Sequence, residues 1–395
     1  MTIVLFTHPI FRFSHSMSRF ASLIKQGMEV RGHSVEVWSP SPIFHRLPAP
    51  HRYKKWLGYI DQYFVFPHQI RSRLKKMNKN TLFIFTDQVH GPWVPLVKKL
   101  PHVIHIHDLI AIRSAQGEFE EYHHTSWSGR IYQSMIRHGL EQSRCFISVS
   151  KKTLFDLNHS ISAKPQLSEY IYNGLYYPFK MMSRTNCNAI LSSIECQLCG
   201  SGFMLHVGGN QWYKNRLGVL DIYKHYVEKV EAPLPLLLVG EPPTNEMQIA
   251  ISRMGSKSEI IFVKNLTNVQ MCAIYSSARL LLFPSLAEGF GWPIAEAMAC
   301  GCPVLTTNEA PMTEVGGDAA FYIPRRPGAN FSLWAHSASG TVIDILALPA
   351  EELERRRVLG YVQSGRFDIQ CMLDAYENFY LRALSNAGAM VNSGV

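Results

Sequence analysis

The sequence has no long apolar run and no leader-like start. No stretch reaches the roughly eighteen consecutive apolar residues that a membrane-spanning helix requires. The first apolar run, Thr2–Phe6, has no basic residues before it and ends in polar ones, as a first β-strand does and a signal peptide does not. We therefore expect a cytoplasmic protein without a transmembrane segment.

Cysteines are few, and no pattern of metal ligands is complete. Eight cysteines are scattered along the 395 residues. Cys196 and Cys199 have the spacing of metal ligands, but only Cys187 offers a nearby thiol and no second pair follows. Free thiols in a reducing compartment are therefore favoured over zinc. No Asp-x-Asp metal motif is present either, so we expect no metal cofactor.

The composition is that of a globular α/β protein. Apolar residues make up 47% and charged residues 17% of a chain long enough for two or three domains. Short runs that are apolar throughout alternate with longer amphipathic segments, which is typical of parallel strands buried on both faces. The expected strands are Thr2–Phe6, Ser34–Trp38, Thr81–Phe85, His102–His107, Cys145–Val149, Glu169–Tyr172, Leu234–Val239, Glu259–Val263, Ala278–Phe283, Pro303–Thr306 and Ala319–Ile323.

The order of the segments predicts two doubly wound domains. Met17–Arg31 has a helical pattern that Gly32 closes before the second strand, which gives the first crossover. A polar, aperiodic stretch later in the chain is typical of an interdomain connection. We expect an N-terminal Rossmann-like domain over 1–178, a linker over 179–201, a C-terminal Rossmann-like domain over 202–362 and a helical tail over 363–395.

The net charge of +9 is concentrated in residues 51–100, where lysines and arginines face only Asp61 and Asp87. Aromatic residues such as Tyr53 and Trp56 are interleaved with the basic ones. Such a pattern fits a solvated helix face, a nucleic-acid contact or an anionic membrane surface.

Residues 281–304 combine a strand, a glycine-containing turn and a helix. Gly289 and Gly291 lie in the turn, and the helix has Pro293 near its first position. A turn of this kind brings backbone N–H groups close to a ligand, and the helix N-terminus favours an anion such as a diphosphate. A plain strand-to-helix connection is the alternative.

Two carboxylates, Glu288 and Glu296, lie at the ends of this turn and can accept hydrogen bonds from the hydroxyl groups of a polyol. The run Pro284–Val304 resembles the E-x7-E motif of retaining glycosyltransferase family 4, which includes mannosyltransferase-like enzymes of bacterial glycan biosynthesis. Thr307–Ala320 continues the pattern. The resemblance implies the GT-B fold, in which two Rossmann-like domains face each other across a cleft and the last helix crosses back to the first domain.

The resemblance also implies a donor site on the second domain. The segment Phe203–Arg216 resembles the family's strand, glycine turn and Lys-Asn pair, whose lysine neutralises the donor diphosphate. Gly209 stands where the family often has an arginine. Either Arg216 or backbone amides replace that cation, or Arg216 is simply a solvated residue. Glu288 is expected at the sugar hydroxyls and Glu296 at the ribose. The expected donor-binding residues are Gly208, Gly209, Asn210, Lys214, Glu288, Gly289, Phe290, Gly291, Trp292 and Glu296.

The first domain is expected to contribute a catalytic histidine and the acceptor site. His107, followed by Asp108 at a strand end, resembles the family histidine that faces the donor sugar, whereas His105 lies deeper in the strand. The expected catalytic residues are His107, Glu288 and Lys214. Candidates on the acceptor side come from another strand end and from the loop after the first strand, which lacks the family's glycines: Asp87, His90, His15 and Ser16.

Together these features predict a retaining, metal-independent hexosyltransferase of polysaccharide or lipopolysaccharide biosynthesis. It transfers mannose or glucose from a GDP- or UDP-hexose to a saccharide or lipid-linked acceptor, and Mg²⁺ is dispensable. The basic region over 51–100 is expected to contact an anionic membrane peripherally at its inner face, and not nucleic acid. Two alternatives stay open: a sugar-nucleotide epimerase of the same fold, and a non-catalytic protein that binds sugar nucleotides or membranes.

Overall fold

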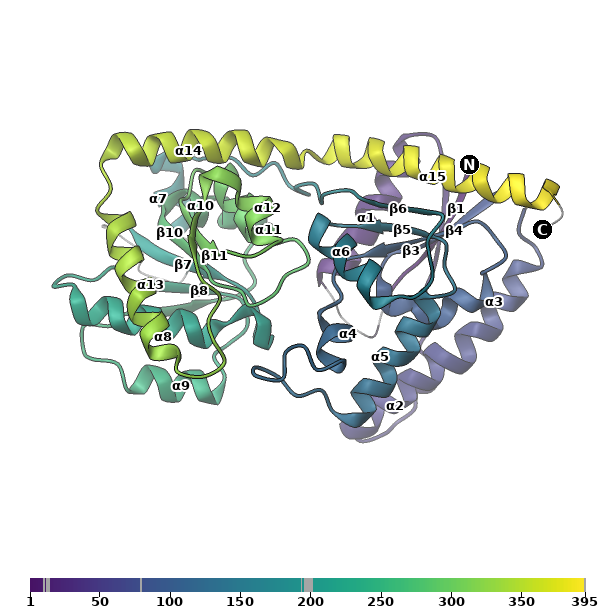
Figure 1. The fold of residues 1–395 in the computed structure, drawn as a ribbon, viewed down its shortest axis with the longest axis horizontal. Helices are drawn as coiled ribbons and strands as arrows, with labels where there is room; N and C mark the ends of the chain where they lie inside the picture. The colour runs from purple at the N-terminus through teal and green to yellow at the C-terminus, as the bar shows by residue number, and fades with distance from the viewer. Residues whose placement is uncertain (10, 12–14, 79, 193, 195–201, 394–395) are drawn as a thin grey trace. The chain divides into compact units, whose positions relative to one another are not determined.

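The computed structural model describes residues 1–9, 11, 15–78, 80–192, 194 and 202–393 (Figure 1). The chain divides into two units. The first holds Met1–Glu118, Thr125–Tyr172 and Gln370–Val395, and the second holds Phe119–His124 and Asn173–Ile369. The chain therefore enters the second unit after Tyr172, whereas the sequence analysis places the connection at 179–201, a stretch that contains helix α7 (Arg184–Leu191).

The first unit is built on a parallel sheet in which apolar runs are buried on both faces. Its six strands have the order β2-β1-β3-β4-β5-β6. Each neighbouring pair is parallel, as the crossovers predicted. The strands are β1 (Thr2–Phe6), β2 (Ser34–Trp38), β3 (Thr81–Phe85), β4 (His102–Ile106), β5 (Cys145–Ser148) and β6 (Leu167–Tyr170).

Helices cover this sheet and supply the rest of its core. On one face, Phe66 and Ile136 pack against strand residues such as Phe6 and Phe85. On the other face the last helix docks, because the Tyr380 hydroxyl lies 2.7 Å from Nε2 of the buried His105 on β4. The helices are α1 (His15–Val30), α2 (His51–Ile60), α3 (Phe66–Leu74), α4 (Ile110–Ala115), α5 (Trp127–Leu140), α6 (Lys151–Ser160) and α15 (Ile369–Ser393), with shorter turns η1 (Phe44–Arg46), η2 (Asp61–Val65) and η3 (Gln88–Leu96).

The second unit repeats the architecture. Its six parallel strands have the order β12-β11-β10-β7-β8-β9. Helices lie on both faces of this sheet (Figure 1). The strands are β7 (Phe203–Val207), β8 (Leu236–Val239), β9 (Ile260–Val263), β10 (Ala278–Phe283), β11 (Val304–Thr307) and β12 (Phe321–Ile323). The helical segments are α7, η4 (Trp212–Lys214), α8 (Arg216–Lys229), α9 (Asn245–Ser252), α10 (Asn268–Ser277), α11 (Trp292–Ala299), α12 (Met312–Gly316), η5 (Gly317–Ala319), α13 (Phe331–Leu346), α14 (Ala350–Ser364) and η6 (Gly365–Phe367).

No single described helix is long and apolar enough to cross a membrane. One pair, Phe331–Leu346 with Ala350–Asn386, passes the test of length and composition only when taken together, and it is bent by 102°.

Candidate functional site

The turn between β10 and α11 has the geometry that its glycines predict. Gly291 precedes α11 with φ +99°, a left-handed conformation that glycine adopts without strain. Pro293 occupies the first turn of the helix, where its missing N–H costs no hydrogen bond. Trp292 begins the helix, and Phe290 is buried with its ring edge-on to Phe367 at 5.2 Å. The backbone of this turn therefore lies at a helix N-terminus, where an anion is favoured.

Lys214 and Glu288 form an ion pair beside that turn. The Lys214 Nζ donates to both carboxylate oxygens of Glu288, at 2.8 and 2.9 Å. Both side chains are largely buried, with 18% and 7% exposed. The Leu286 N–H donates to the Tyr213 carbonyl at 2.8 Å and holds the two loops together. A desolvated pair of this kind keeps both charges in fixed positions.

Glu296 is held by a tyrosine that the sequence analysis did not identify. Its Oε2 accepts a hydrogen bond of 2.8 Å from the Tyr275 hydroxyl. Glu296 is 6% exposed and Tyr275 is fully buried. Burial, together with the nearby Glu296 charge, raises the pKa of Tyr275 well above its usual value, so the hydroxyl stays a donor. Tyr275 therefore orients the second glutamate of the motif.

The glycine turn after β7 is tied to β8 by Arg216. Arg216 donates to the Asn210 side chain and, at 2.8 Å, to the Glu241 carbonyl. It is 4% exposed, so the expectation that it is a solvated residue is wrong. Its Nε and Nη2 have no hydrogen-bond partner in the part of the chain that the structure describes. Gly208 approaches the next strand closely, since a Cβ on Gly240 would lie 2.2 Å from the Gly208 carbonyl oxygen.

The backbone N–H of Asn210 donates to the Glu241 carboxylate at 2.9 Å, and its side-chain amide donates to the Pro242 carbonyl at 2.8 Å. The Asn210 side chain is therefore already bonded within the protein. Gly209 follows Gly208 in the same turn and brings no cation, which leaves Lys214 as the residue of the predicted donor set that carries a positive charge.

In the first unit, His107 lies at the carboxyl end of β4, as expected. Its Nε2 lies 2.9 Å from the Thr86 carbonyl, and its backbone N–H donates to the Gln88 side chain at 2.9 Å. The ring packs edge-on to Phe20 at 4.4 Å. Burial lowers the pKa of His107, which favours a neutral ring. Because Nε2 is engaged, Nδ1 is the ring nitrogen left for a ligand.

Asp87 and His90 gather near His107, and His8 joins them. The Asp87 Oδ2 accepts a hydrogen bond of 2.8 Å from His8 Nε2. The ring of His90 lies 4.8 Å from the ring of His8 and stacks on Trp93. Among the described residues, neither nitrogen of the buried His90 has a hydrogen-bond partner. Burial lowers the pKa of His90 well below its usual value, so its ring is neutral. The sequence analysis missed His8, although its place just past the first strand was a signal for it.

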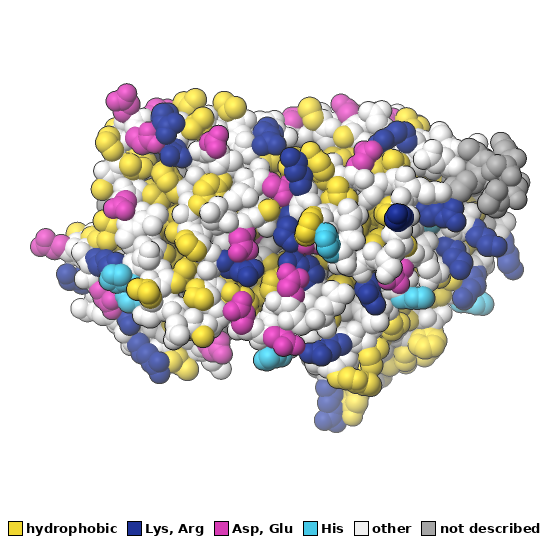
Figure 2. Space-filling model, viewed as in Figure 1, with side chains coloured by type: hydrophobic (Ala, Val, Ile, Leu, Met, Phe, Trp, Pro, Cys, Tyr) yellow, Lys and Arg dark blue, Asp and Glu magenta, His cyan; other side chains and the backbone are white. Residues whose placement is uncertain are grey.

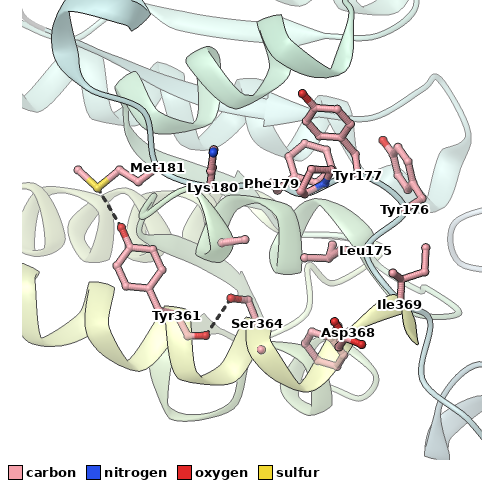
Figure 3. Close-up of a pocket in the computed structure, with 14 residues that line it drawn as sticks. Leu175, Tyr176, Tyr177, Phe179, Lys180, Met181, Tyr361, Ser364, Asp368 and Ile369 are labelled. Atoms are coloured by element: carbon pink, nitrogen blue, oxygen red, sulfur yellow. Dashed lines mark hydrogen bonds between the residues drawn. The ribbon is translucent and has the colours of Figure 1, made fainter. Parts of the chain in front are cut away.

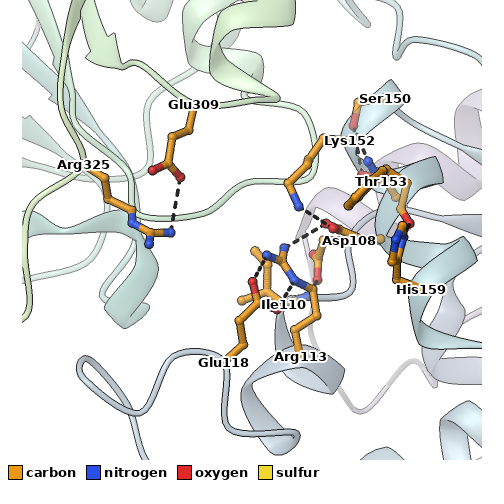
Figure 4. Close-up of polar contacts among 12 residues, drawn as sticks. Asp108, Ile110, Arg113, Glu118, Ser150, Lys152, Thr153, His159, Glu309 and Arg325 are labelled. Carbon is orange, nitrogen blue, oxygen red and sulfur yellow. Dashed lines mark hydrogen bonds and ion pairs between the residues drawn. The ribbon is translucent and has the colours of Figure 1, made fainter.

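Asp108, the other residue of the strand-end motif, has a structural contact. Its Oδ1 accepts a hydrogen bond of 3.1 Å from the Ile110 N–H at the start of α4. On α4, Arg113 pairs with Glu118 and donates to Asp156 at 2.8 Å (Figure 4). This network fixes the segment that follows His107. In the second unit Arg325 lies 3.2 Å from Glu309 and forms an ion pair with it, which is also drawn in Figure 4.

Other predicted residues fall outside these clusters. His15 and Ser16 begin α1, but their side chains lie outside the described part of the structure. Cys196 and Cys199 also lie outside it, while Cys187 is a free, buried thiol. Among the described residues, no group of histidine, cysteine, aspartate and glutamate could hold a metal ion.

A cavity of about 510 Å³ in the second unit contains none of the predicted site residues (Figure 3). Aromatic side chains such as Tyr176 and Tyr361 line it, and the Tyr361 hydroxyl contacts the Met181 sulfur at 2.9 Å. No residue of the Glu288 turn lines the cavity, but Phe367, which does line it, packs against Phe290 of that turn.

Residues 200–325 match the family model described as "Glycosyl transferases group 1". This segment holds the glycine turn, Lys214 and both glutamates. Over residues 200–325 the second unit is thus similar to the glycosyltransferase group 1 domain, and the recognition made from the sequence is confirmed at that level.

Relatives and solved structures agree with this assignment. The chain is 26% identical over 235 residues to "O-antigen chain mannosyltransferase B" of Escherichia coli. This match covers 58% of this chain and 59% of that protein. The match thus spans less than two thirds of the relative. The structure resembles Anabaena HepE in complex with UDP and glucose, with a TM-score of 0.69, 16% identity and coverage of 95% and 98% of the two chains. It also resembles WaaG, a glycosyltransferase involved in lipopolysaccharide biosynthesis, with a TM-score of 0.69, 17% identity and the coverage 95% and 98%. The predicted GT-B fold class is confirmed.

Proposed function

We propose that this protein is a hexosyltransferase that moves mannose or glucose from a nucleoside diphosphate sugar to a saccharide or lipid-linked acceptor. The activity belongs to glycan biosynthesis of the lipopolysaccharide or O-antigen type. The family match, the mannosyltransferase relative and the fold of a protein seen with UDP and glucose support it. They do not favour the epimerase or the non-catalytic alternative.

The observation that carries the proposal is the Lys214–Glu288 pair beside the α11 N-terminus, with Glu296 about one turn further on. A leaving diphosphate gains negative charge, which the Lys214 ammonium and the N–H groups of the Gly289–Trp292 turn stabilise. Glu288 accepts hydrogen bonds from the hexose hydroxyls. Glu296, oriented by Tyr275, accepts them from the ribose.

His107 in the first unit supplies a ring nitrogen to a hexose hydroxyl. From the resemblance to family 4 we assign the reaction to retaining transfer. Because no side chain in the predicted set has the character of an activated nucleophile, we assign front-face attack as its route. The protein itself supplies the positive charge, and Mg²⁺ is dispensable under this proposal. Hexose transfer from GDP-mannose or UDP-glucose to octyl α-D-mannopyranoside, measured with and without EDTA, tests both the transferase activity and its independence of Mg²⁺. Nucleotide release that requires added Mg²⁺ contradicts the metal-independent part.

Thermal unfolding with GDP, UDP, ADP and TDP identifies the nucleotide. One of them is expected to raise the Tm of the wild type, because a ligand that binds only the folded state stabilises it. Glu296→Ala is expected to weaken the binding of that nucleotide about 10- to 100-fold, because hydrogen bonds to a charged group are lost. Glu228→Ala, in an exposed pair with Lys224 at 3.8 Å, is the matched control and keeps the full shift. An unchanged shift in Glu296→Ala contradicts the ribose assignment.

We further propose that the protein works in the cytoplasm, with the α2–α3 segment of the first unit on an anionic membrane surface. Trp56 and Phe64 are 61% and 74% exposed, and Arg71 and Lys75 lie exposed on the same segment. Figure 2 shows lysine and arginine side chains gathered on the side of the first unit that carries α3, with hydrophobic ones nearby. Apolar insertion together with basic contacts is the combination that binds a peripheral protein.

Sedimentation with phosphatidylglycerol vesicles measures this contact. The double variant Trp56→Ala and Phe64→Ala is expected to lower the partition coefficient by about tenfold or more, because each ring loses its apolar burial. Leu333→Ala, which removes a side chain 78% exposed in the second unit, is the control and leaves partitioning unchanged. Equal sedimentation of the double variant and the wild type contradicts the membrane assignment.

A further inference from the structure

A histidine–carboxylate pair in the first unit has no role in the donor chemistry. His8 Nε2 lies 2.8 Å from the Asp87 carboxylate, and the two residues are 79 positions apart in the chain. Their side chains are 18% and 7% exposed. His8 is the more exposed of the two, so the pair is a partly covered polar site.

The fold brings this pair to the edge of the sheet where parallel α/β proteins bind ligands. His8 follows β1, Asp87 follows β3 and His107 follows β4, and these three strands are neighbours in the order β2-β1-β3-β4. All three residues therefore lie at the carboxyl ends of adjacent strands. The sheet topology, and not the position of any one residue, creates the cluster.

The ring of His8 is held in one orientation. Its backbone carbonyl accepts a hydrogen bond of 2.8 Å from the Ser39 hydroxyl after β2. The ring of His90 packs at 4.8 Å on one side and is itself stacked on Trp93 at 4.8 Å with an interplanar angle of 11°. A polar group held by packing and by a hydrogen-bonded partner is preorganised for a ligand.

Asp87 decides which hydrogen-bonding character His8 presents. Although burial disfavours the charged carboxylate, the hydrogen bond from His8 lowers the pKa of Asp87 to about 2. The carboxylate is therefore ionised and takes the Nε2–H. In the neutral ring, Nδ1 is then a lone-pair acceptor. Within the described part of the chain Nδ1 has no hydrogen-bond partner, and the adjacent negative charge disfavours a phosphate.

We propose that His8 Nδ1 accepts a hydrogen bond from the attacking hydroxyl of the saccharide acceptor, and that Asp87 is the positioning residue that holds the ring for it. This inference rests on the proposed hexosyltransferase function and assigns the acceptor side of that reaction. The imidazole nitrogen accepts hydrogen bonds and lies beside a buried carboxylate. It therefore selects a ligand with an uncharged hydrogen-bond donor, such as a sugar hydroxyl.

Two substitutions separate this role from a structural one. In His8→Asn, the amide oxygen takes the place of Nδ1 and can still accept from the acceptor hydroxyl. In His8→Gln, the longer amide reaches the place of Nε2 and can still donate to Asp87. With octyl α-D-mannopyranoside, the KM for the acceptor is expected to rise about tenfold in His8→Gln, which is the size of one lost hydrogen bond. In His8→Asn it is expected to stay within about threefold of the wild type. The reverse order, or equal KM values, overturns the assignment.

A matched pair in the same unit provides the control. His33 Nε2 lies 2.7 Å from the Glu377 carboxylate, but His33 precedes β2 and so lies at the opposite edge of the sheet. His33→Gln and His33→Asn are expected to leave the acceptor KM unchanged. A wild type that transfers no hexose overturns the proposed function and this inference with it. An active wild type whose His8 variants fail the expected order overturns this inference alone.

Discussion

Replacing Lys214 with alanine is expected to lower the kcat for hexose transfer by about 10²- to 10³-fold, the loss seen when one preorganised charge-stabilising group is removed. Lys214 is the cation held at the diphosphate turn, where its Nζ lies 2.8 Å from Glu288. Without it the leaving diphosphate gains charge with no cation of the predicted donor set beside it. Nucleotide release under saturating donor measures the effect.

The control for this variant is Lys224→Ala. Lys224 is 46% exposed and pairs with Glu228 at 3.8 Å, so its loss changes stability and activity little. Lys214→Arg keeps the charge and is expected to recover part of kcat. If Lys214→Ala lowers only the Tm and leaves kcat unchanged, the residue is a structural partner of Glu288 and its catalytic role is disproved.

Gly139→Ala is expected to destabilise the first unit by about 3 kcal/mol, which corresponds to a fall in Tm of about 6–12 °C for a unit of this size. A Cβ on Gly139 would lie 1.9 Å from the carbonyl oxygen of Gly91, which is backbone that cannot rotate away. Gly91 lies in η3, the segment that follows Asp87 and carries His90. The same substitution is therefore expected to weaken acceptor use as well.

Gly340→Ala is the matched control for that substitution. Gly340 lies inside α13, and a Cβ there meets nothing within 4 Å. Alanine in an open helix position is expected to stabilise the protein by up to about 1 kcal/mol. Thermal unfolding measures the Tm of both variants. A Gly139→Ala protein with the Tm of the wild type contradicts the prediction and shows that η3 and α5 can move apart at little cost.

The strands and the donor motif were predictable because their signals are local. Apolar runs such as Thr2–Phe6 and Ala278–Phe283 were predicted with the bounds that the structure has. The turn at Gly291 was predicted from residues within one strand, one loop and one helix. Its conformation depends on local backbone sterics, which a glycine at this position satisfies wherever the rest of the chain lies.

The partners of the motif residues were not predictable in the same way. Lys214 and Glu288 are 74 residues apart, and Tyr275 and Glu296 are 21 apart. Arg216 was open between a replacement cation for the phosphates and a solvated side chain, and its burial against the glycine turn rules out the solvated alternative. These contacts depend on which strands become neighbours, and side-chain pattern alone does not give that order.

The sequence by itself determined two parallel-sheet units, the glycine turn at a helix N-terminus and the two glutamates beside it, because each follows from periodicity and turn chemistry over a few residues. Only the tertiary structure decided that His8, Asp87, His90 and His107 meet. Strand order places β1 between β2 and β3, and β4 next to β3, so residues far apart in the chain share one edge of the sheet.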